Sequence, residues 1–422
     1  MLIPSNLLKN KKILLGVTGS IAVYKSLELV RFFVKAGADV RVVMSESAKK
    51  FVTPLSFETL TSNKVLDDTN ESWVDDHNHI KITQWADIFV IAPTTANTIA
   101  KIANAIADNI LLQCALAFPK KKVIAPSANT NMLENPISKA NLKMLAIANY
   151  EIVDTQTKEL ACKVVGDGAM AEPINIFWET SRILLRDEFW ADRMVLVTGG
   201  GTIEKIDDVR YISNFSSGKM ASAVATALYC KGADVNLIST KFDVDLPKDI
   251  HTIDVEDSLE MKEYLIDSIR IAKKGKLSKP TLMGSEQIQH IAKKPYLFMV
   301  AAVSDYVPEF TQNGKMKKDM LGDKFELSLK KNVDILDSIN KDGIVTIGFK
   351  AEMDKANAIA NASSMLKRKN LDGVCLNILE NSNSFGTDNN EVDFITNESV
   401  TKIPNNDKLS LAFKILESSK LV

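Results

Sequence analysis

Two loops of the sequence carry side chains that could hold and deliver protons. His79 lies in "HNHIKITQW", ahead of an apolar run, and Cys162 lies in "ACKVVGDGAM", among polar residues and glycines. An imidazole titrates near neutral pH, and a thiol in a polar loop can exchange its proton with a reaction intermediate. Single histidines and cysteines are usually structural, so these two residues are candidate proton carriers and do not yet define a reaction.

Two turns rich in small residues could bind phosphate. The first, "GVTGSIAVYK", contains Thr18, Gly19 and Ser20, and the second, "VLVTGGGTIEK", contains Gly199 to Gly201. Backbone N–H groups at the start of a helix attract anions, and small residues let a phosphate approach closely. Neither turn reads G-x-G-x-x-G, and at the first a tight turn without a ligand remains an equal alternative.

Polar side chains follow several strand-like runs of the first half. Ser45 comes after "DVRVVM", Thr94 and Thr95 end or follow "DIFVIAP", and Asn129 follows "KKVIAPS". Ligands of parallel α/β sheets bind at the carboxyl ends of the strands, where these residues are expected to converge. Hydroxyl and amide groups suit a neutral ring edge and a phosphate. Glu46 could instead hold the ribose of NAD, so the type of cofactor stays open.

The second half carries an acidic residue and a short run of lysines. Asp305 follows the apolar run "YLFMVAAV", and Lys315 opens the cluster "KMKK", which also includes Lys317 and Lys318. Such a pair could bind Mg²⁺ and phosphates, although a lysine run is more often a solvated loop. A short-chain dehydrogenase would need a Tyr-x-x-x-Lys spacing, which the sequence lacks.

Alternating apolar strands and amphipathic helices must position these residues. The alternation starts at "KKILLGV" and restarts at "MVLVTGG", which predicts an α/β protein of two doubly wound Rossmann-like domains, residues 1–190 and 191–422. A polar helix over "INIFWETSRILLRDEFWADR" is expected to join them. Residues 272–295 are expected to form a long excursion, and the segment after Asn390 a hairpin.

The composition is that of an ordinary globular protein and argues against several classes. The chain has 422 residues, a formal net charge of −1, 45% hydrophobic residues and no apolar run long enough to span a bilayer. We expect neither nucleic-acid nor membrane binding. Four cysteines without a C-x-x-C pair predict reduced thiols and a cytoplasmic protein. Cys114, Cys230 and Cys375 lie in apolar segments and are expected to be core residues.

The motifs of the first half together resemble a known family. "GVTGSIAVYKSLELVR", "HIKITQWADIFVIAPTTANTIAKIANAIADN", "PSANTNM" and "C…GDGAM" are similar in order and spacing to the homo-oligomeric flavin-containing cysteine decarboxylases. The resemblance implies FMN as cofactor and oxidative decarboxylation of 4′-phosphopantothenoylcysteine. It implies a role for His79 in that step, binding of the substrate carboxylate by Asn129, and proton delivery by Cys162 for the final reduction.

The motifs of the second half resemble phosphopantothenate–cysteine ligases, which occur fused to such decarboxylases. The resemblance implies CTP and Mg²⁺, and an acyl-cytidylate bound by Asn214. The residues that it implies for nucleotide contact are Asp305, which would also face the metal, Lys315, the 333–336 segment (Val333, Asp334, Ile335 and Leu336), Phe349 and Lys369. Its substrates would be 4′-phosphopantothenate, cysteine and CTP. The resemblance also implies a homo-oligomer, with trimers through the flavin half and dimers through the ligase half.

Some positions depart from the family patterns. Ala128 replaces a usual methionine, and Lys163 and Ala169 replace a glycine and an arginine near the candidate thiol. Met365 stands where a lysine is expected, and Val333 where proline is common. The alternatives are an NAD(P)-dependent reductase and a flavin-binding regulatory protein with an inactive ligase half.

Overall fold

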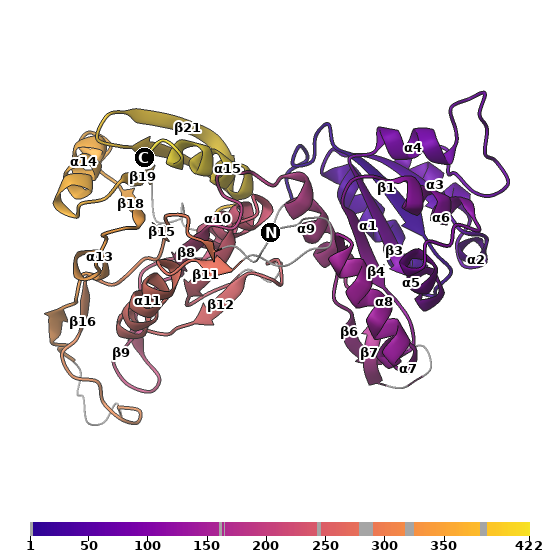
Figure 1. Ribbon diagram of the computed structural model, residues 1–422. Helices are drawn as coiled ribbons and strands as arrows, with labels where there is room; N and C mark the ends of the chain where they lie inside the picture. Colours follow the sequence, from indigo (N-terminus) through magenta and orange to yellow (C-terminus); the bar gives the residue numbers. More distant parts are fainter. Residues whose placement is uncertain are drawn as a thin grey trace. The chain divides into compact units, whose positions relative to one another are not determined.

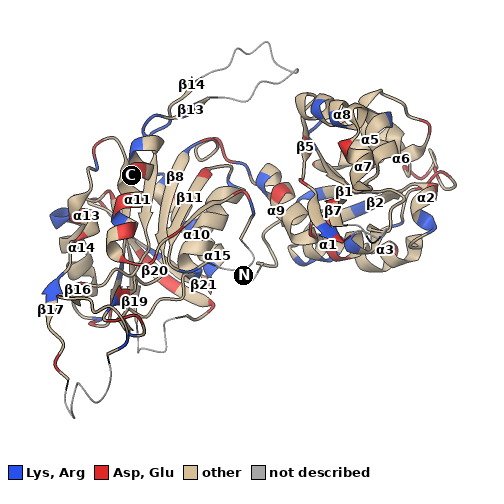
Figure 2. Ribbon diagram, turned by 90° about the horizontal axis from the view of Figure 1, so that it is seen from below, with Lys and Arg blue, Asp and Glu red and all other residues tan. Residues whose placement is uncertain are grey.

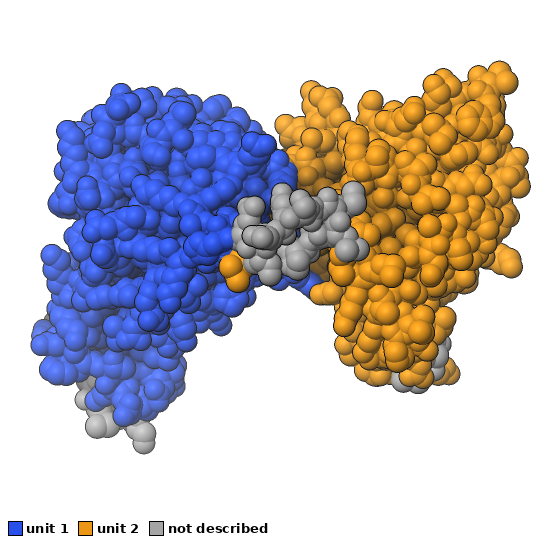
Figure 3. Space-filling view, viewed as in Figure 1, with its two compact units in different colours: residues 1–2, 186–276, 290–422 blue, residues 3–185, 277–289 orange. Residues whose placement is uncertain are grey.

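The structure, a computed structural model, describes residues 3–159, 163, 165–242, 246–277, 290–316, 325–379 and 386–422. The chain forms two compact units (Figure 3), which we call the amino-terminal unit, residues 3–185, and the carboxyl-terminal unit, residues 186–276 and 290–422. The residues at which they divide, Leu185 and Arg186, follow the last helix of the amino-terminal unit.

The described part of the amino-terminal unit contains a five-stranded parallel sheet (Figure 1) in the order β2-β1-β3-β4-β5. Its strands are β1 (Lys12–Val17), β2 (Asp39–Met44), β3 (Ile88–Thr94), β4 (Lys122–Pro126) and β5 (Tyr150–Ile152). Strands β1, β3 and β4 are apolar and almost wholly buried, as expected of a sheet covered by helices on both faces. The order 2-1-3-4-5 is that of flavodoxin-like folds, which bind their ligand between the first and third strands.

Helices connect these strands. They are α1 (Val23–Lys35), α2 (Glu46–Lys49), α3 (Pro54–Thr61), α4 (His79–Trp85), α5 (Ala96–Ala103), α6 (Ile110–Ala117), α7 (Thr130–Glu134), α8 (Pro136–Ile147) and α9 (Pro173–Leu184). Helix α1 ends at Lys35, two residues before Gly37, whose φ of +87° glycine adopts without strain. A hairpin of β6 (Gln156–Glu159) and β7 (Val165–Ala169) precedes α9.

The expectation of one polar helix between the units is wrong. Helix α9 ends at Leu184 and buries Ile176, Phe177 and Trp178, with Phe177 in contact with the rings of Phe32 and Phe33. It therefore belongs to the core of the amino-terminal unit. The buried face, which also includes the hydroxyls of Thr180 and Ser181, packs against α1.

The described part of the carboxyl-terminal unit contains an eight-stranded sheet in the order β12-β11-β8-β15-β18-β19-β20-β21. The strands are β8 (Met194–Gly199), β11 (Asp234–Ser239), β12 (His251–Asp254), β15 (Tyr296–Met299), β18 (Val345–Glu352), β19 (Gly373–Ile378), β20 (Asn389–Ile395) and β21 (Val400–Asp407). The first six are parallel, in the Rossmann order 3-2-1-4-5-6. Two doubly wound α/β domains are therefore confirmed.

Helices α10 (Lys219–Cys230), α11 (Ser258–Ala272), α13 (Ile335–Ser338), α14 (Ala358–Arg368) and α15 (Lys408–Ser419) accompany this sheet. The expected hairpin after Asn390 is confirmed, because β20 and β21 pair antiparallel and extend the sheet. Small ribbons complete the described part: β9 (Glu204–Lys205) with β10 (Tyr211–Ile212), β13 (Lys276–Leu277) with β14 (His290–Ile291), and β16 (Tyr306–Pro308) with β17 (Leu329–Lys331). Residues 278–289 of the expected excursion 272–295 lie outside the described residues.

The described surface carries both signs of charge. Figure 2 shows basic and acidic residues interspersed along the ribbons of both units. Among the described helices, none is long and apolar enough to cross a membrane.

Candidate functional site

The carboxyl ends of β1 and β3 meet through Thr18. This residue is buried, and its Oγ1 donates to the carbonyl of Pro93 at 2.7 Å and accepts from the N–H of Thr95 at 3.2 Å. Thr95 in turn begins α5, where its hydroxyl accepts from Thr98 N. The side chain of Thr18 therefore joins the ends of β1 and β3 at the point where the strand order of the sheet reverses.

Gly19 and Ser20 bring the turn close to neighbouring segments. A Cβ at Gly19 would lie 2.4 Å from Cβ of Ser47, so only glycine fits there. The hydroxyl of Ser20 lies 3.0 Å from that of Ser127, which follows β4. Thr94, by contrast, is fully buried, and its hydroxyl donates to Ile91 O within its own strand. The proton of its hydroxyl is therefore already engaged, and its contact with a cofactor stays a prediction.

Two hydroxyls near this end of the sheet are buried without a partner. They are Oγ of Ser45, which follows β2, and Oγ1 of Thr130, which begins α7. A buried hydroxyl without a hydrogen bond costs free energy and is rare in proteins, so each is suited to a ligand group. Together with the close approach at Gly19, these donors fit a phosphate and a polar ring edge.

The loop of Asn129 is held against the hairpin β6–β7. Ala128 N donates to Gly168 O at 3.1 Å, and a Cβ at Gly168 would lie 2.2 Å from Ala128 O. A Cβ at Gly166 would lie 2.2 Å from Oγ1 of Thr130. The two glycines therefore let the hairpin that leads to Cys162 pack directly on the Asn129 loop. Cys162 itself lies outside the described residues.

Lys25 fixes the other end of this hairpin. It is 8% exposed, and its Nζ donates to Met170 O at 2.9 Å and to Oε1 of Glu172 at 3.3 Å. Burial lowers the pKa of Lys25, and the carboxylate of Glu172 partly offsets that effect. Glu172 also contacts Lys158 on β6, so one carboxylate joins α1 to the first strand of the hairpin.

His79 is the first residue of α4. Asn78 caps this helix, with its Oδ1 accepting from Ile80 N and Lys81 N. The imidazole Nδ1 of His79 lies 2.6 Å from Oε1 of Glu71, and the ring meets that of Trp73 edge to face. The side chain of His79 is 21% exposed, so it is held in place and still reachable.

In the carboxyl-terminal unit, three loops converge between β8 and β15. Asn214 Nδ2 donates to Val303 O at 3.0 Å, and Thr202 Oγ1 accepts from Ser304 N at 3.1 Å. Gly200 has a φ of +76°, and a Cβ there would lie 2.0 Å from Oγ1 of Thr240. Asn214 thus contacts Val303, which lies two residues before the exposed Asp305. These loops and the expected anion-binding turn lie at the Rossmann switch point.

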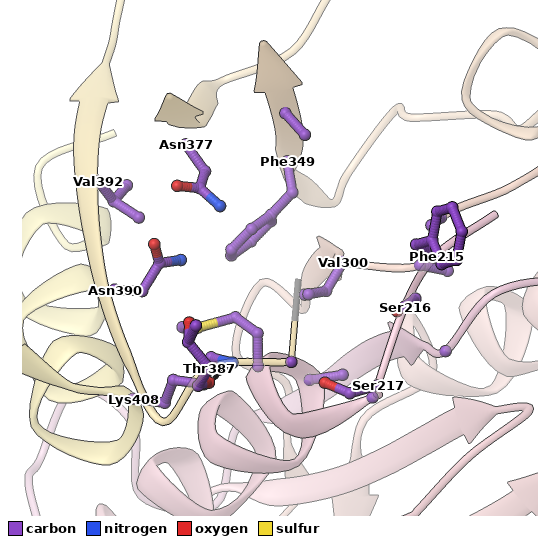
Figure 4. Close-up of a pocket in the computed structure, with 18 of the residues that line it drawn as sticks. Phe215, Ser216, Ser217, Val300, Phe349, Asn377, Thr387, Asn390, Val392 and Lys408 are labelled. Atoms are coloured by element: carbon purple, nitrogen blue, oxygen red, sulfur yellow. Dashed lines mark hydrogen bonds between the residues drawn. The ribbon is translucent and has the colours of Figure 1, made fainter. Parts of the chain in front are cut away.

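A pocket of about 200 Å³ opens beside these loops (Figure 4). Ser216, Ser217 and Gly218 line it ahead of α10, and Figure 4 shows Phe349 and Asn377 turned toward the same space from β18 and β19. An aromatic face, an amide and a turn with small residues can together hold a heterocyclic base and a phosphate chain.

Comparisons with known proteins identify the two units. The Flavoprotein family model matches residues 1–183, and the model of the DNA/pantothenate metabolism flavoprotein C-terminal domain matches residues 190–274 and 277–420. The coenzyme A biosynthesis bifunctional protein of Borreliella burgdorferi is 34% identical over 97% of this chain and 99% of its own length. The Bacillus subtilis protein is 35% identical over 97% of each chain.

The chain belongs to the bifunctional coenzyme A biosynthesis proteins. It is an enzyme of that pathway, with a flavoprotein decarboxylase half and a ligase half, as the motifs predicted. The findings do not favour the NAD(P)-dependent reductase or the regulatory protein.

Solved structures give matches to each half. The C-terminal domain of a coenzyme A biosynthesis bifunctional protein is 27% identical, covers 55% of this chain and 95% of its own, and has a TM-score of 0.42. A PPC decarboxylase mutant complexed with pantothenoylaminoethenethiol is 33% identical, covers 42% and 98%, and has a TM-score of 0.38. The FMN binding protein AtHal3 is 34% identical, covers 42% and 96%, and has a TM-score of 0.37.

The residues predicted to contact the nucleotide differ in their surroundings in this bifunctional protein. Phe349 lines the pocket, whereas Ile335 and Leu336 are buried in the hydrophobic core. Of the 333–336 segment, only Val333 and Asp334 are exposed. The side chains of Ile335 and Leu336 therefore support the segment, and any contact they make with a nucleotide would come from backbone atoms.

Lys369 is already engaged by the segment that precedes α13. Its Nζ lies 2.5 Å from Oδ2 of Asp334, and this lysine with neighbouring N–H groups holds the pKa of Asp334 below its usual value, although burial alone would raise it. Met365, the departure from the family's lysine, packs against the hydrophobic core instead, with its Cε near Gly348. Lys367 is exposed.

The candidate magnesium residue has no preformed cluster around it. Among the described residues, no group of three or more histidines, cysteines or acids could hold a metal ion. Mg²⁺ commonly binds through one or two carboxylates and the phosphates of a substrate. The single exposed carboxylate of Asp305 fits that donor set.

Asp207 holds the described start of the KMKK segment, residues 315–318, which we call the lysine loop. Its carboxylate is buried and accepts from the backbone N–H groups of Val209, Arg210 and Met316 and from the guanidinium of Arg210. Burial alone would raise the pKa of Asp207, but these donors hold it far below its usual range. Lys315, which precedes Met316, is exposed, and Lys317 and Lys318 lie outside the described residues.

We expect the substitution Asp207→Asn to impair ligation. The amide would place its own N–H groups against the donors of Arg210 and Met316, so the lysine loop would lose its anchor. Misplacement of a substrate-binding loop by about 1 Å can cost on the order of 100-fold, and we expect ligation kcat/KM to fall by roughly 10- to 100-fold, as measured by pyrophosphate release. The pKa of Asp207 is lowered in the folded protein, so its carboxylate is charged and holds the loop at any pH above the usual aspartate pKa. This stabilisation of the loop is lost only as the pH falls through the lowered pKa. Unchanged ligation kinetics would contradict this anchoring role.

The motifs did not single out several residues that the structure places at the sites. Asn377 is an amide within the otherwise apolar strand "GVCLNI", which is a readable signal. Glu71 and Lys25 have no such signal, because their contacts depend on loops that return to α4 and to the hairpin. The three described free cysteines, Cys114, Cys230 and Cys375, are buried, as expected, and burial raises the thiol pKa of Cys114 and Cys375.

Proposed function

We propose that the chain converts 4′-phosphopantothenate, cysteine and CTP into 4′-phosphopantetheine in two steps. A ligase domain, proposed to span residues 191–422, would ligate cysteine to the acid, and a decarboxylase domain, proposed to span residues 1–190, would decarboxylate the product. The observation that carries this proposal is the presence of two separate doubly wound sheets, each with small-residue turns and polar side chains at its own switch point. The order of the steps follows from the chemistry, since the product of ligation is the substrate of decarboxylation.

Ligation requires activation of a carboxylate, which is a poor electrophile. The carboxylate of 4′-phosphopantothenate would attack the α-phosphate of CTP, forming an acyl-cytidylate and releasing pyrophosphate. Asp305 would hold a Mg²⁺ ion on the phosphates and Lys315 would offset their charge, while Asn214 would bind the acyl group. The amine of cysteine would then attack the acyl carbon and release CMP.

The first unit is proposed to hold FMN at Thr18, Gly19, Ser20, Ser45 and Thr95, with Thr94 shaping the strand end. The unpartnered Ser45 hydroxyl and the close approach at Gly19 support this fit. When bound, FMN would accept two electrons from the thiol-bearing carbon of the substrate and return them after CO₂ has left. Asn129 would bind the departing carboxylate, His79 would accept the thiol proton, and Cys162 would donate the proton that completes the enethiol carbon.

One coupled assay tests the whole proposal. The purified chain is given 4′-phosphopantothenate, cysteine and CTP with Mg²⁺, and pyrophosphate and CO₂ are measured together. We expect both products in equal amounts and a yellow protein with the absorption spectrum of FMN. Substitution of ATP for CTP, or omission of Mg²⁺, should reduce both products. Protein without flavin that makes neither product with any nucleotide would contradict the proposal.

The substitution Cys162→Ser tests the decarboxylase half at its last step. A serine hydroxyl is a far weaker acid than a thiol, so CO₂ should still be released while the enethiol accumulates. General acid catalysis contributes on the order of 10²- to 10⁴-fold, and we expect 4′-phosphopantetheine formation to fall by about that factor. Mass spectrometry of the products distinguishes the two compounds. Normal output of 4′-phosphopantetheine would refute the role of Cys162.

A cytoplasmic location and a homo-oligomer complete the proposal. Free, buried thiols at Cys114, Cys230 and Cys375 support a reducing compartment. Ile21 and Tyr24, beside the Thr18 turn, are 60% and 61% exposed, which suits a contact with a second copy. We propose trimers through the flavin half and dimers through the ligase half.

A further inference from the structure

The loop before α4 places a carboxylate directly against His79. Glu71 Oε1 lies 2.6 Å from Nδ1 of the imidazole and also accepts from the backbone N–H of His79 at 3.3 Å. Both side chains are about three-quarters buried, with exposed fractions of 21% for His79 and 27% for Glu71. This contact is therefore shielded from solvent on most sides, unlike an ordinary surface pair.

The backbone on both sides of the contact is fixed. Ser72 N donates to His77 O at 2.8 Å and so closes the loop that carries Glu71. Asn78 caps α4, and the hydroxyl of Thr83 donates to His79 O at 2.8 Å. The ring of Trp73 lies edge-on to the imidazole, with 5.8 Å between centroids. Rotation of the imidazole away from Glu71 would break this hydrogen bond.

We infer that Glu71 is a positioning residue, which keeps the His79 proton on Nδ1 and leaves Nε2 to accept a proton from the substrate. In a neutral imidazole one nitrogen donates and the other accepts, and a carboxylate can only accept. The contact at Nδ1 therefore selects the tautomer with a free electron pair on Nε2. When Nε2 takes up the thiol proton, the ring becomes cationic beside the Glu71 carboxylate, which stabilises that charge.

This inference rests on the proposed role of His79 in decarboxylation. A simpler reading is that Glu71 is only an acid near the start of a helix, where it would interact with first-turn N–H groups. The two readings differ in what they predict for the imidazole. Only a positioning role makes the tautomer of His79 depend on the charge of residue 71.

The test uses ¹⁵N-histidine labelling of the full-length flavoprotein. The chain has four histidines, so the His79 signals can be assigned by their loss in His79→Gln. In the unmodified protein we expect Nδ1 to be protonated and Nε2 unprotonated. In Glu71→Gln, whose amide can donate as well as accept, we expect a mixture of both tautomers. The decarboxylation kcat should fall by about 10- to 100-fold, the usual effect of losing the partner that orients a histidine, with little change in KM.

Asp76→Asn is the matched control, because Asp76 lies in the same loop and its Oδ1 is 3.6 Å from Lys81 Nζ on α4. It removes one carboxylate near this helix without touching His79, so tautomer and kcat should stay unchanged. Flavin content and ligation should be the same in all variants, which shows that the chain is folded. An unchanged tautomer or an unchanged kcat in Glu71→Gln would overturn the inference. Full decarboxylation by His79→Gln would instead overturn the proposed role of His79, whatever the tautomer.

Discussion

Replacement of Gly19 by alanine is expected to yield a protein that has lost most of its flavin. The added Cβ would lie 2.4 Å from Cβ and 2.9 Å from the carbonyl carbon of Ser47, so the turn after β1 or the start of α2 must move. The turn after β1 contains Thr18, and α2 directly follows Ser45, whose hydroxyl is buried without a hydrogen-bond partner. Overpacking of this kind costs about 1–3 kcal/mol. If that cost falls on the bound state, FMN affinity drops by roughly 10- to 100-fold.

The measurement is the flavin absorbance per chain after gel filtration, followed by titration with FMN. Decarboxylation should fall in proportion to the flavin lost and should recover in part at high FMN concentration. Pyrophosphate release by the carboxyl-terminal unit serves as the internal control and should not change. A variant that binds FMN as tightly as the unmodified protein would show that the turn does not form the cofactor site.

The substitution Asn214→Asp is expected to abolish most ligation and to leave decarboxylation intact. Nδ2 of Asn214 donates to Val303 O, and an aspartate would place a carboxylate oxygen 3.0 Å from that carbonyl instead. The loop that leads to Asp305 would lose this bond. The new negative charge would also oppose two anionic substrates. Loss of one preorganised donor at a reacting acyl group costs about 10²- to 10³-fold, and we expect a decrease in ligation kcat of that order.

Separate assays of the two reactions decide the outcome. Pyrophosphate release from CTP reports ligation, and CO₂ release from added 4′-phosphopantothenoylcysteine reports decarboxylation. Circular dichroism should show an unchanged fold. If both activities are lost in a folded Asn214→Asp variant, the two reactions do not use separate sites.

The amino-acid sequence was sufficient for the fold class, for both units and for the strand ends. Runs such as "KILLGV" and "MVLVTG" are apolar on both faces, which only a sheet covered on two sides can bury, and the small residues after them mark the turns. The helix 174–193 was misjudged because its average polarity hides an apolar face that packs against α1. The nucleotide contact predicted for Ile335 and Leu336 stays a prediction, and the structure adds that their apolar side chains belong to the core.

The local sequence therefore determined which residues can do chemistry and at which end of a strand they lie. Strand and turn patterns depend on neighbours a few residues apart, so they can be read along the chain. Only the tertiary structure decided which hydroxyls already have hydrogen-bond partners, as at Thr18, and which are buried without one, as at Ser45. It also decided that Glu71 meets His79 and that Lys25 meets the end of the β6–β7 hairpin. Such contacts depend on how loops and elements pack in space, and no spacing of residue types specifies them.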